Sequence, residues 1–517
     1  MFVKRRFATQ VQLASRAPSA SPRTPNYQTT NEKDINRRLR DFLPVPAGIS
    51  SVSDSVILRE VLVKSTFCKA RVWLFLLISV LVVTVGCGGG SSPSGSGSGG
   101  DPNITIATFP TQIGAGANWQ FTATVTGASN PGVNWSVTTA NAGTIDSSGL
   151  YIAPTTGTFP MSVTISAASQ ANASLTSSAN ITVTQTDPLG AAQGTAINCP
   201  NFSGGLPNAG STCYQVNTSC PGMADFSVYL KVNQPTGASL GTVLFGTGTG
   251  GSALYDNDPP DFFNGTTNGG LAVVQNVLNA GFTTVQVTFG SPFTDATPNG
   301  WLTGPGGVRR AACRYATAAQ WVYQNIHNSN TSAPLCATGN SGGAGAIGYA
   351  LTDYGLDSIF SFVETTSGPP MARLDLGCAA ASSSACQPHQ FQCNPGDPVQ
   401  NLSTCYGTDD AGIIDMAYSQ PLCKNAVNGA TPPTGLFESD SILGGPARTF
   451  PKTRVHVLLG GQDSSAAVEQ GIAWFDALTS TTSSQSCVSD APHPIPSAAD
   501  GASTIATDIQ TMCKLQP

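Results

Sequence analysis

Twelve of the fourteen cysteines lie in the C-terminal part of the chain, between Cys199 and Cys513. An even number of cysteines confined to one region is typical of a disulfide framework, which forms and persists in an oxidising compartment. A zinc site would need paired Cys-x2-Cys or His-x3-His spacings, and the sequence has no such pair of pairs. The sequence therefore predicts an exported body with up to six disulfides, and neither a metal site nor a cofactor.

An apolar stretch at 72–86 follows several basic residues and ends directly before Cys87. This is the arrangement of an export signal, and the stretch is shorter than the roughly 20 residues that span a bilayer. Val83-Thr-Val-Gly-Cys87 resembles the lipobox of bacterial lipoproteins, in which the cysteine is lipidated and becomes the mature N-terminus. The resemblance implies a membrane anchor through lipid at Cys87. The alternative is an uncleaved N-terminal anchor.

Charge is distributed unevenly along the chain, which carries 23 basic and 29 acidic residues and a net charge of -6. Thirteen of the basic residues precede residue 72, so residues 1–87 are interpreted as a basic extension with the signal, and 88–101 as a Gly/Ser linker. The remaining body is acidic and lacks the basic footprint that nucleic acid requires. We therefore expect no nucleic-acid partner. We expect the body to be lipid-anchored at the outer surface or in the periplasm, or secreted.

Residues 102–186 contain no cysteine and show short runs in which apolar and polar residues alternate, such as Trp119–Val125. Alternation with period two over strands of this length predicts a β-sandwich. The pattern Val133-x-Trp135 followed by Gly149-Leu-Tyr resembles bacterial immunoglobulin-like domains of the Big type. That resemblance implies an immunoglobulin-like domain that serves as a stalk or spacer, with binding of a surface or glycan as the alternative.

Residues 187–517 are predicted to form an α/β domain, because strands alternate with helices from Ala224 onward. Strands are expected at 226–232, 242–245, 284–289, 335–338, 358–363 and 454–459, and helices at 308–327, 344–354, 466–478 and 499–512. The segment from about 365 to 453 has five cysteines and no clear periodicity. Because long irregular segments inside domains tend to be lids or binding insertions, we expect it to shape the substrate pocket.

Gly339-Asn-Ser-Gly-Gly343 lies between a predicted strand and a predicted helix. Gly-x-Ser-x-Gly in that setting is a nucleophile elbow, a turn so tight that the residues two before and two after the serine must lack side chains. The turn presents the serine hydroxyl at the upper edge of the sheet. Ser341 is therefore the candidate nucleophile, and Gly339 and Gly343 are the candidate elbow glycines.

A nucleophilic serine needs a base, and His493 is the histidine that lies in a loop after the last predicted strand. His327, at a helix end, and His456, within a strand, are expected to be structural. The order Ser341, Asp463, His493 is that of α/β-hydrolases. In this order the histidine would accept the serine proton, and the aspartate would orient the imidazole.

Asp463 follows the strand that ends at Leu459, where the acid of such a triad is best sought. The competing role for Asp463 is the N-cap of the next helix. Asp440 and Asp490 are weaker substitutes for the acid.

The tetrahedral intermediate of acyl transfer needs backbone N–H donors. One candidate is the N–H of Gly342, and the other comes from the loop Gly246-Thr-Gly-Thr-Gly-Gly251, where Thr249 and Gly250 are the candidates. The same six residues match Gly-x-Gly-x-x-Gly. A dinucleotide site is disfavoured, because two prolines stand where a helix should begin and no acidic residue follows the next strand.

The elbow, the triad order and the oxyanion loop make residues 225–517 resemble an α/β-hydrolase with a mostly parallel sheet flanked by helices. Secreted members of this family are largely carboxylic ester hydrolases. The resemblance implies a serine esterase that acts through an acyl-enzyme, on an ester substrate that can be polysaccharide-linked or polymeric. Two alternatives remain open: a non-catalytic surface binding or adhesion protein, and a serine peptidase of the same fold.

In tannase and feruloyl esterase relatives a cysteine adjoins the catalytic serine and another adjoins the histidine. Asn340 and Pro494 occupy those places here. Cys336 and Cys487 lie five and six residues before Ser341 and His493, which would allow a looser tie between the two loops.

Overall fold

The computed structural model describes residues 102–199, 205–258, 261–265, 267–290, 300–479 and 482–515, all within one compact unit, Gly97–Pro517. The predicted basic extension, the export signal with Cys87 and the linker lie outside the described residues. Within the described part, no helix is both long and apolar enough to cross a membrane.

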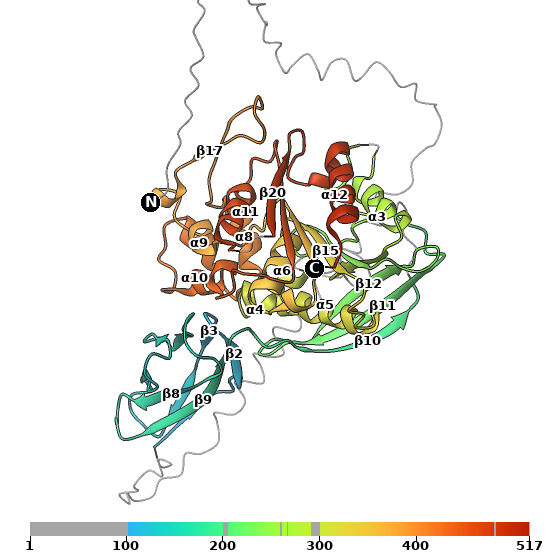
Figure 1. The fold of residues 1–517 in the computed structure, drawn as a ribbon. Helices are drawn as coiled ribbons and strands as arrows, with labels where there is room; N and C mark the ends of the chain where they lie inside the picture. The colour runs from blue at the N-terminus through green and yellow to red at the C-terminus, as the bar shows by residue number, and fades with distance from the viewer. Residues whose placement is uncertain are drawn as a thin grey trace, which may run out of the picture. The chain divides into compact units, whose positions relative to one another are not determined.

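The segment in which alternation predicts β structure contains short strands in the structure (Figure 1). They are β1 (Asn103–Ile106), β2 (Gln112–Gly114), β3 (Asn118–Gln120), β4 (Ala123–Thr126), β5 (Val133–Val137), β6 (Thr144–Ile145), β7 (Leu150–Ile152), β8 (Met161–Ser169) and β9 (Thr176–Thr184). They pair as β2-β9-β8-β5, β3-β7-β6 and β1-β4. The small sheets share a core that includes Phe121, Tyr151 and Ile165. This part is all-β, and its likeness to the Big type stays a prediction.

A mixed sheet forms the centre of the remaining described residues, in the order β10-β11-β12-β14-β13-β15-β16-β19-β20. Its strands are β10 (Ala191–Ile197), β11 (Ser211–Ser219), β12 (Phe226–Asn233), β13 (Thr242–Gly246), β14 (Thr283–Thr288), β15 (Leu335–Asn340), β16 (Phe362–Thr366), β19 (Arg454–Gly460) and β20 (Ser483–Val488). The pairs from β14 to β20 are parallel, and β10, β11 and β12 are antiparallel. The carboxyl ends of the parallel strands therefore meet at one edge.

Helices cover both faces of this sheet, because successive side chains of each strand point to opposite faces. The helices are α3 (Gly269–Asn279), α4 (Val308–Ala311), α5 (Cys313–Asn325), α6 (Gly342–Thr352), α11 (Ala466–Ala477) and α12 (Ala499–Met512). On β13, Val243 and Phe245 pack into the core shared with α3 and α12, whereas Leu244 packs into the core of α5, α6 and α11. The expected α/β layers, a mostly parallel sheet flanked by helices, are present, with antiparallel strands added at one edge.

The sheet begins earlier than the sequence predicts, with β10 and β11 before Ala224. Both strands are rich in small and polar residues, and β10 is an edge strand with no buried residue. Apolar alternation is therefore weak in both. β20 lies at the opposite edge of the sheet and is also polar, because an edge strand is only partly buried. The sequence therefore does not predict it. The strand expected at 358–363 lies at Phe362–Thr366.

The segment expected to be irregular, about 365–453, contains many short elements. They are α7 (Leu374–Gly377), η3 (Ser384–Cys386), β17 (His389–Phe391), β18 (Gln400–Leu402), α8 (Thr408–Asp415), α9 (Leu422–Val427), α10 (Leu436–Asp440) and η4 (Ile442–Gly444). Two disulfides, Cys378–Cys423 and Cys386–Cys405, lie within it, and Cys393–Cys487 joins it to β20. The insertion is thus a cross-linked structure rather than a structureless loop.

The predicted disulfide framework is confirmed, since all twelve cysteines from Cys199 onward pair in the described residues. The remaining bridges are Cys199–Cys213, Cys220–Cys313 and Cys336–Cys513. The sequence allows Cys336 and Cys487 to join the loops of Ser341 and His493, and this expectation is wrong, because the two cysteines have other partners. Cys336 on β15 pairs with Cys513 after α12 because that helix packs across the face of the sheet to which Cys336 points.

Candidate active site

Ser341 lies at the turn between β15 and α6, with φ of 52° and ψ of -113°. A residue other than glycine at positive φ is strained and persists only where its surroundings hold it. Here the N–H of Ser341 donates to the carbonyl oxygen of Thr366 at 2.8 Å, next to it on β16. Ser341 thus has the strand-to-helix geometry of a nucleophile elbow.

The glycines around Ser341 are required by close backbone approaches. A Cβ at Gly339 would lie 2.6 Å from the carbonyl carbon of Gly343, and one at Gly343 would lie 2.7 Å from the carbonyl oxygen of Gly246. A Cβ at Gly342 would lie 1.8 Å from the carbonyl oxygen of Thr249. Each distance is too short for a real Cβ, so the turn can form only with these glycines.

His493 and Asp463 meet at the same edge of the sheet. Asp463 follows β19, His493 lies between β20 and α12, and Nδ1 of His493 is 2.8 Å from Oδ2 of Asp463. The other carboxylate oxygen of Asp463 accepts from the N–H of Ser465 at 2.9 Å. Ser465 itself is the N-cap of α11, so the N-cap role considered for Asp463 is wrong.

The electrostatics of this pair favour a charged aspartate and a basic imidazole. Burial opposes ionisation of Asp463, but the hydrogen bond and charge of His493 outweigh it and lower the pKa of the carboxyl. Burial also opposes protonation of His493. The hydrogen bond and charge of Asp463 outweigh that effect, with help from the charges of Asp261 and Asp410, and raise the pKa of the imidazole above 6.5.

Ser341 and His493 line one cavity of about 130 Å³. Its apolar wall consists of Pro370, Met371, Tyr406, Ile413, Ile414, Ala466 and Ala467. Most of these residues belong to the insertion, as expected from its position in the sequence. Their individual roles had no signal in the sequence, because only the fold brings α8 over the elbow.

Thr249 lies against Gly342 and lines the same cavity. Within the described chain, the backbone N–H groups of these two residues donate to no protein acceptor. They could therefore both donate to an oxyanion beside Ser341. Gly250 is not brought into the cavity lining, and its carbonyl oxygen accepts from the N–H of Trp301 at 2.9 Å.

The other candidates from the sequence lie elsewhere. Both ring nitrogens of His327 have partners, Thr242 Oγ1 at 3.0 Å and the carbonyl oxygen of Asn330 at 2.8 Å. Asp440 is buried, and its carboxylate accepts from the N–H of Val308. Asp490 is exposed.

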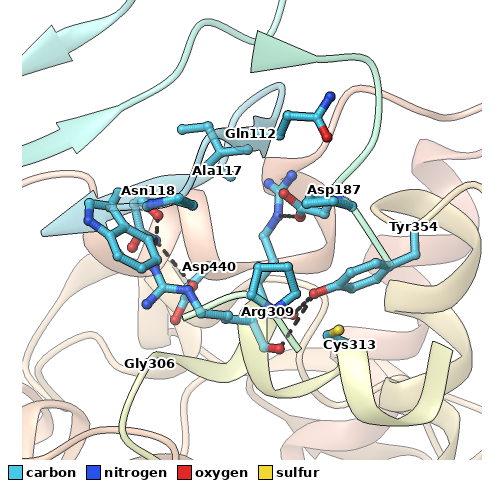
Figure 2. Close-up of a pocket in the computed structure, with 15 residues that line it drawn as sticks. Gln112, Ala117, Asn118, Asp187, Gly306, Arg309, Cys313, Tyr354 and Asp440 are labelled. Carbon is cyan, nitrogen blue, oxygen red and sulfur yellow. Dashed lines mark hydrogen bonds and ion pairs between the residues drawn. The ribbon is translucent and has the colours of Figure 1, made fainter. Parts of the chain in front are cut away.

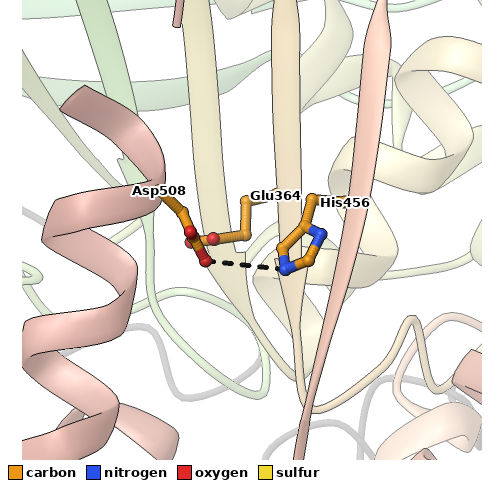
Figure 3. Close-up of side chains that lie close together, drawn as sticks. All are labelled: Glu364, His456 and Asp508. Atoms are coloured by element: carbon orange, nitrogen blue, oxygen red, sulfur yellow. Dashed lines mark ion pairs between the residues drawn. The ribbon is translucent and has the colours of Figure 1, made fainter. Parts of the chain in front are cut away.

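His456 belongs to a second cluster of ionisable groups, together with Glu364 and Asp508 (Figure 3). His456 Nε2 is 3.5 Å from Asp508 Oδ2, and Glu364 Oε1 accepts from Thr338 Oγ1 at 3.1 Å. Their possible ligand atoms lie within 4.8 Å of one another, a set that could hold a divalent metal. Burial, followed by the charge of Asp508, raises the pKa of Glu364 well above its usual range. A proton shared between the carboxyl groups of Glu364 and Asp508 would therefore also reduce the negative charge of the cluster.

Arg309 lines another cavity, of about 40 Å³ (Figure 2). Its Nε lies 2.6 Å from Asp187 Oδ2, its Nη1 lies 3.3 Å from Asp353 Oδ1, and its Nη2 donates to the carbonyl oxygen of Ala115 at 2.9 Å. The guanidinium is almost fully buried and its charge is paired. A structural ion-pair network therefore forms part of the wall of this cavity.

Comparisons with known proteins return structures but no sequence relatives. No protein-family model matches the chain, and no curated relative matches it. One similar solved structure is acetyl xylan esterase 1 from Thermoanaerobacterium, with 14% identity, covering 62% of this chain and 87% of that one, at a TM-score of 0.35. Another is carboxyl esterase 2 from Tuber melanosporum, with 15% identity, 60% and 86% coverage, and a TM-score of 0.36. A third is the mouse alpha/beta hydrolase domain-containing protein 10, with 9% identity, 56% and 96% coverage, and a TM-score of 0.33.

Proposed function

We propose that this protein is a serine esterase in which Ser341 is the nucleophile, His493 the general base and Asp463 the orienting acid. The observation that carries the proposal is the 2.8 Å hydrogen bond between His493 and Asp463, combined with a cavity that His493 shares with the elbow residue Ser341. The strained elbow supports the role of Ser341 as well.

In the first half-reaction, Oγ of Ser341 attacks the ester carbonyl carbon and its proton passes to Nε2 of His493. Asp463 accepts the hydrogen bond from Nδ1–H and stabilises the imidazolium. The N–H groups of Gly342 and Thr249 donate to the developing oxyanion.

When the tetrahedral intermediate collapses, the alcohol leaves with the proton from Nε2 and an acyl-enzyme remains. A water molecule then gives a proton to His493 and attacks the acyl carbon. The second collapse releases the acid and returns the proton to Ser341. The net reaction is hydrolysis of one ester bond.

We also propose the location and organisation of the chain. The disulfides support an exported protein, since such frameworks persist in oxidising compartments. A lipid at Cys87 would hold the linker 88–101, the immunoglobulin-like domain at 102–186 and the hydrolase domain at 187–517 at a membrane surface. The substrate would then be an external ester, polysaccharide-linked or polymeric.

Turnover of p-nitrophenyl butyrate by the purified protein and by Ser341→Ala tests the catalytic proposal. We expect kcat to fall by a factor of about 10³ or more, because the nucleophile is lost. Ser174→Ala, which changes an exposed serine on the β part, is the control and should keep full activity. A fluorophosphonate probe followed by peptide mapping should label Ser341.

Equal rates for the protein and Ser341→Ala would exclude this nucleophile. Absence of any ester turnover would favour a binding protein. Cleavage of peptides in preference to esters would favour a peptidase.

A further inference from the structure

Asp261 is a carboxylate close to the nucleophile that the proposed mechanism does not use. A Cβ built on Gly248 would lie 3.5 Å from Asp261 Oδ2 and 3.7 Å from Ser341 Cβ. The carboxylate and the nucleophile therefore flank the same glycine of the oxyanion loop. The charge of His493 acts on Asp261 as well and favours its ionised form, against the larger effect of burial.

In the part of the chain that the structure describes, no hydrogen bond or ion pair holds the carboxylate of Asp261, although the charge of His493 acts on it. It is half-buried, and burial raises the pKa of its carboxyl. Nor does it cap a helix, since α3, the next helix, has Asn268 as its N-cap. A partly exposed carboxylate that no protein donor holds can accept a hydrogen bond from a ligand.

Asp261 is not among the residues that line the apolar cavity. That cavity can hold one apolar arm of an ester against Met371, Ile413 and Ile414. The other arm of an ester attacked by Ser341 would extend out of this cavity, and the carboxylate of Asp261 lies on the other side of Gly248 from the attacking serine. One arm of the ester would therefore lie in an apolar cavity and the other near a carboxylate. A well-bound ester should accordingly have one apolar arm and one polar arm.

The charges around the site also restrict which substrates it can bind. Asp410 lies in the first turn of α8 and lines the cavity, and no lysine or arginine is among the described lining residues. An anionic substrate would meet the charges of Asp261 and Asp410, with no lysine or arginine in the described lining to compensate them. A neutral hydroxyl can donate to a carboxylate, and such charge-assisted hydrogen bonds are strong.

We infer that Asp261 determines specificity by accepting a hydrogen bond from a hydroxyl group on the arm of the ester that lies outside the apolar cavity. The preferred substrates are then uncharged esters with one apolar arm and one hydroxyl-bearing arm. This inference rests on the proposed esterase function.

Two pairs of esters that match in size test it. 2-Hydroxyethyl butyrate and propyl butyrate differ by a hydroxyl in place of a methyl group on the alcohol arm. Methyl 3-hydroxybutyrate and methyl 3-methylbutyrate differ in the same way on the acyl arm. We expect kcat/KM to favour the hydroxylated member of at least one pair by about 10-fold, the value of a hydrogen bond to a charged group.

The ratio within that pair should fall below about 2 in Asp261→Ala and be partly restored in Asp261→Asn, which keeps an acceptor oxygen. Rates are compared on the alkaline plateau of each variant, because removing Asp261 also lowers the pKa of His493. Asp476→Ala, on the exposed side of α11, is the matched control and should keep the ratio of the unmodified protein. Thermal unfolding checks that each variant is folded.

The outcomes separate the two proposals. If p-nitrophenyl butyrate is not hydrolysed, the esterase function fails. If it is hydrolysed but neither pair shows a preference, or the preference persists in Asp261→Ala, the inference fails alone.

Discussion

Cys393 of the insertion is bonded to Cys487 of β20, six residues before His493 in the sequence. The same bridge therefore holds the insertion against the strand that leads to the proposed base. Two further disulfides keep the insertion itself compact.

Removing this bridge by changing both cysteines to serine should reduce activity more than a loss of stability explains. We expect kcat/KM to fall by about 10-fold, because the insertion carries much of the cavity wall, and unfolding to become easier by about 2–4 kcal/mol. Removing Cys199–Cys213, which joins β11 to the residues just after β10, is the control and should lower stability without altering kcat/KM. Equal activity in both double variants would contradict the role of Cys393–Cys487.

The pH dependence of kcat/KM should reflect the raised pKa of His493. The neutral imidazole is the base, so activity appears as pH rises through this pKa, and the acid limb should have its midpoint above 6.5. Asp410→Asn removes a negative charge that favours the imidazolium. The midpoint should therefore move down, by about 0.5 unit.

Asp409→Asn is the matched control for that shift. Asp409 lies beside Asp410 in the same turn of α8 and is not among the groups that raise the pKa of His493. A midpoint that moves equally in both variants would show that Asp410 has no specific effect.

Gly339→Ala should disrupt the elbow. Its Cβ would lie 2.6 Å from the backbone of Gly343, so β15 and α6 would have to separate. We expect a loss of stability of about 2–3 kcal/mol and activity close to background. Gly412→Ala on α8, where a Cβ meets nothing within 4 Å, should be as stable as the unmodified protein or more so. Denaturant unfolding compares the two, and a stable, active Gly339→Ala would rule out the steric requirement.

Glu364 should make stability depend on pH. Its pKa is raised in the folded state, so the folded protein keeps a proton that the unfolded chain releases above about pH 4.3. The free energy of unfolding then falls as pH rises above that value. Glu364→Gln resembles the protonated acid and should be more stable than the unmodified protein at pH 8, with the difference closing below about pH 4.3.

Glu438→Gln, at an exposed position of α10, serves as the comparison in the same unfolding series. It should follow the pH profile of the unmodified protein. A lower Tm for Glu364→Gln than for the unmodified protein at pH 8 would mean that Glu364 is ionised in the folded state.

The sequence predicts the centre of the α/β part better than its edges. Strands such as β13 and β15 are buried on both faces, so their apolar residues are evident, and the elbow is visible because close packing leaves only glycine at Gly339 and Gly343. The edge strands β10 and β20 carry polar side chains and lack that signal.

The proposed triad could be chosen from the sequence by its order, but the groups around it could not. Asp261 and Asp410 act on His493 from segments more than 80 residues away in the sequence. Nothing in their local pattern differs from that of ordinary surface aspartates. The partners of Cys336 and Cys487 likewise depend on which chain segments pack together, not on distance along the chain.

The positive φ of Ser341 places the proposed nucleophile where the backbone prefers glycine. Holding serine there costs on the order of 1–3 kcal/mol, so Ser341→Gly should unfold at a higher temperature than the unmodified protein. A lower Tm for Ser341→Gly would show that the Ser341 hydroxyl stabilises the fold by more than the strained backbone destabilises it. Under the proposed function, the fold thus gives up stability at this one position to hold the serine hydroxyl at the edge of the sheet.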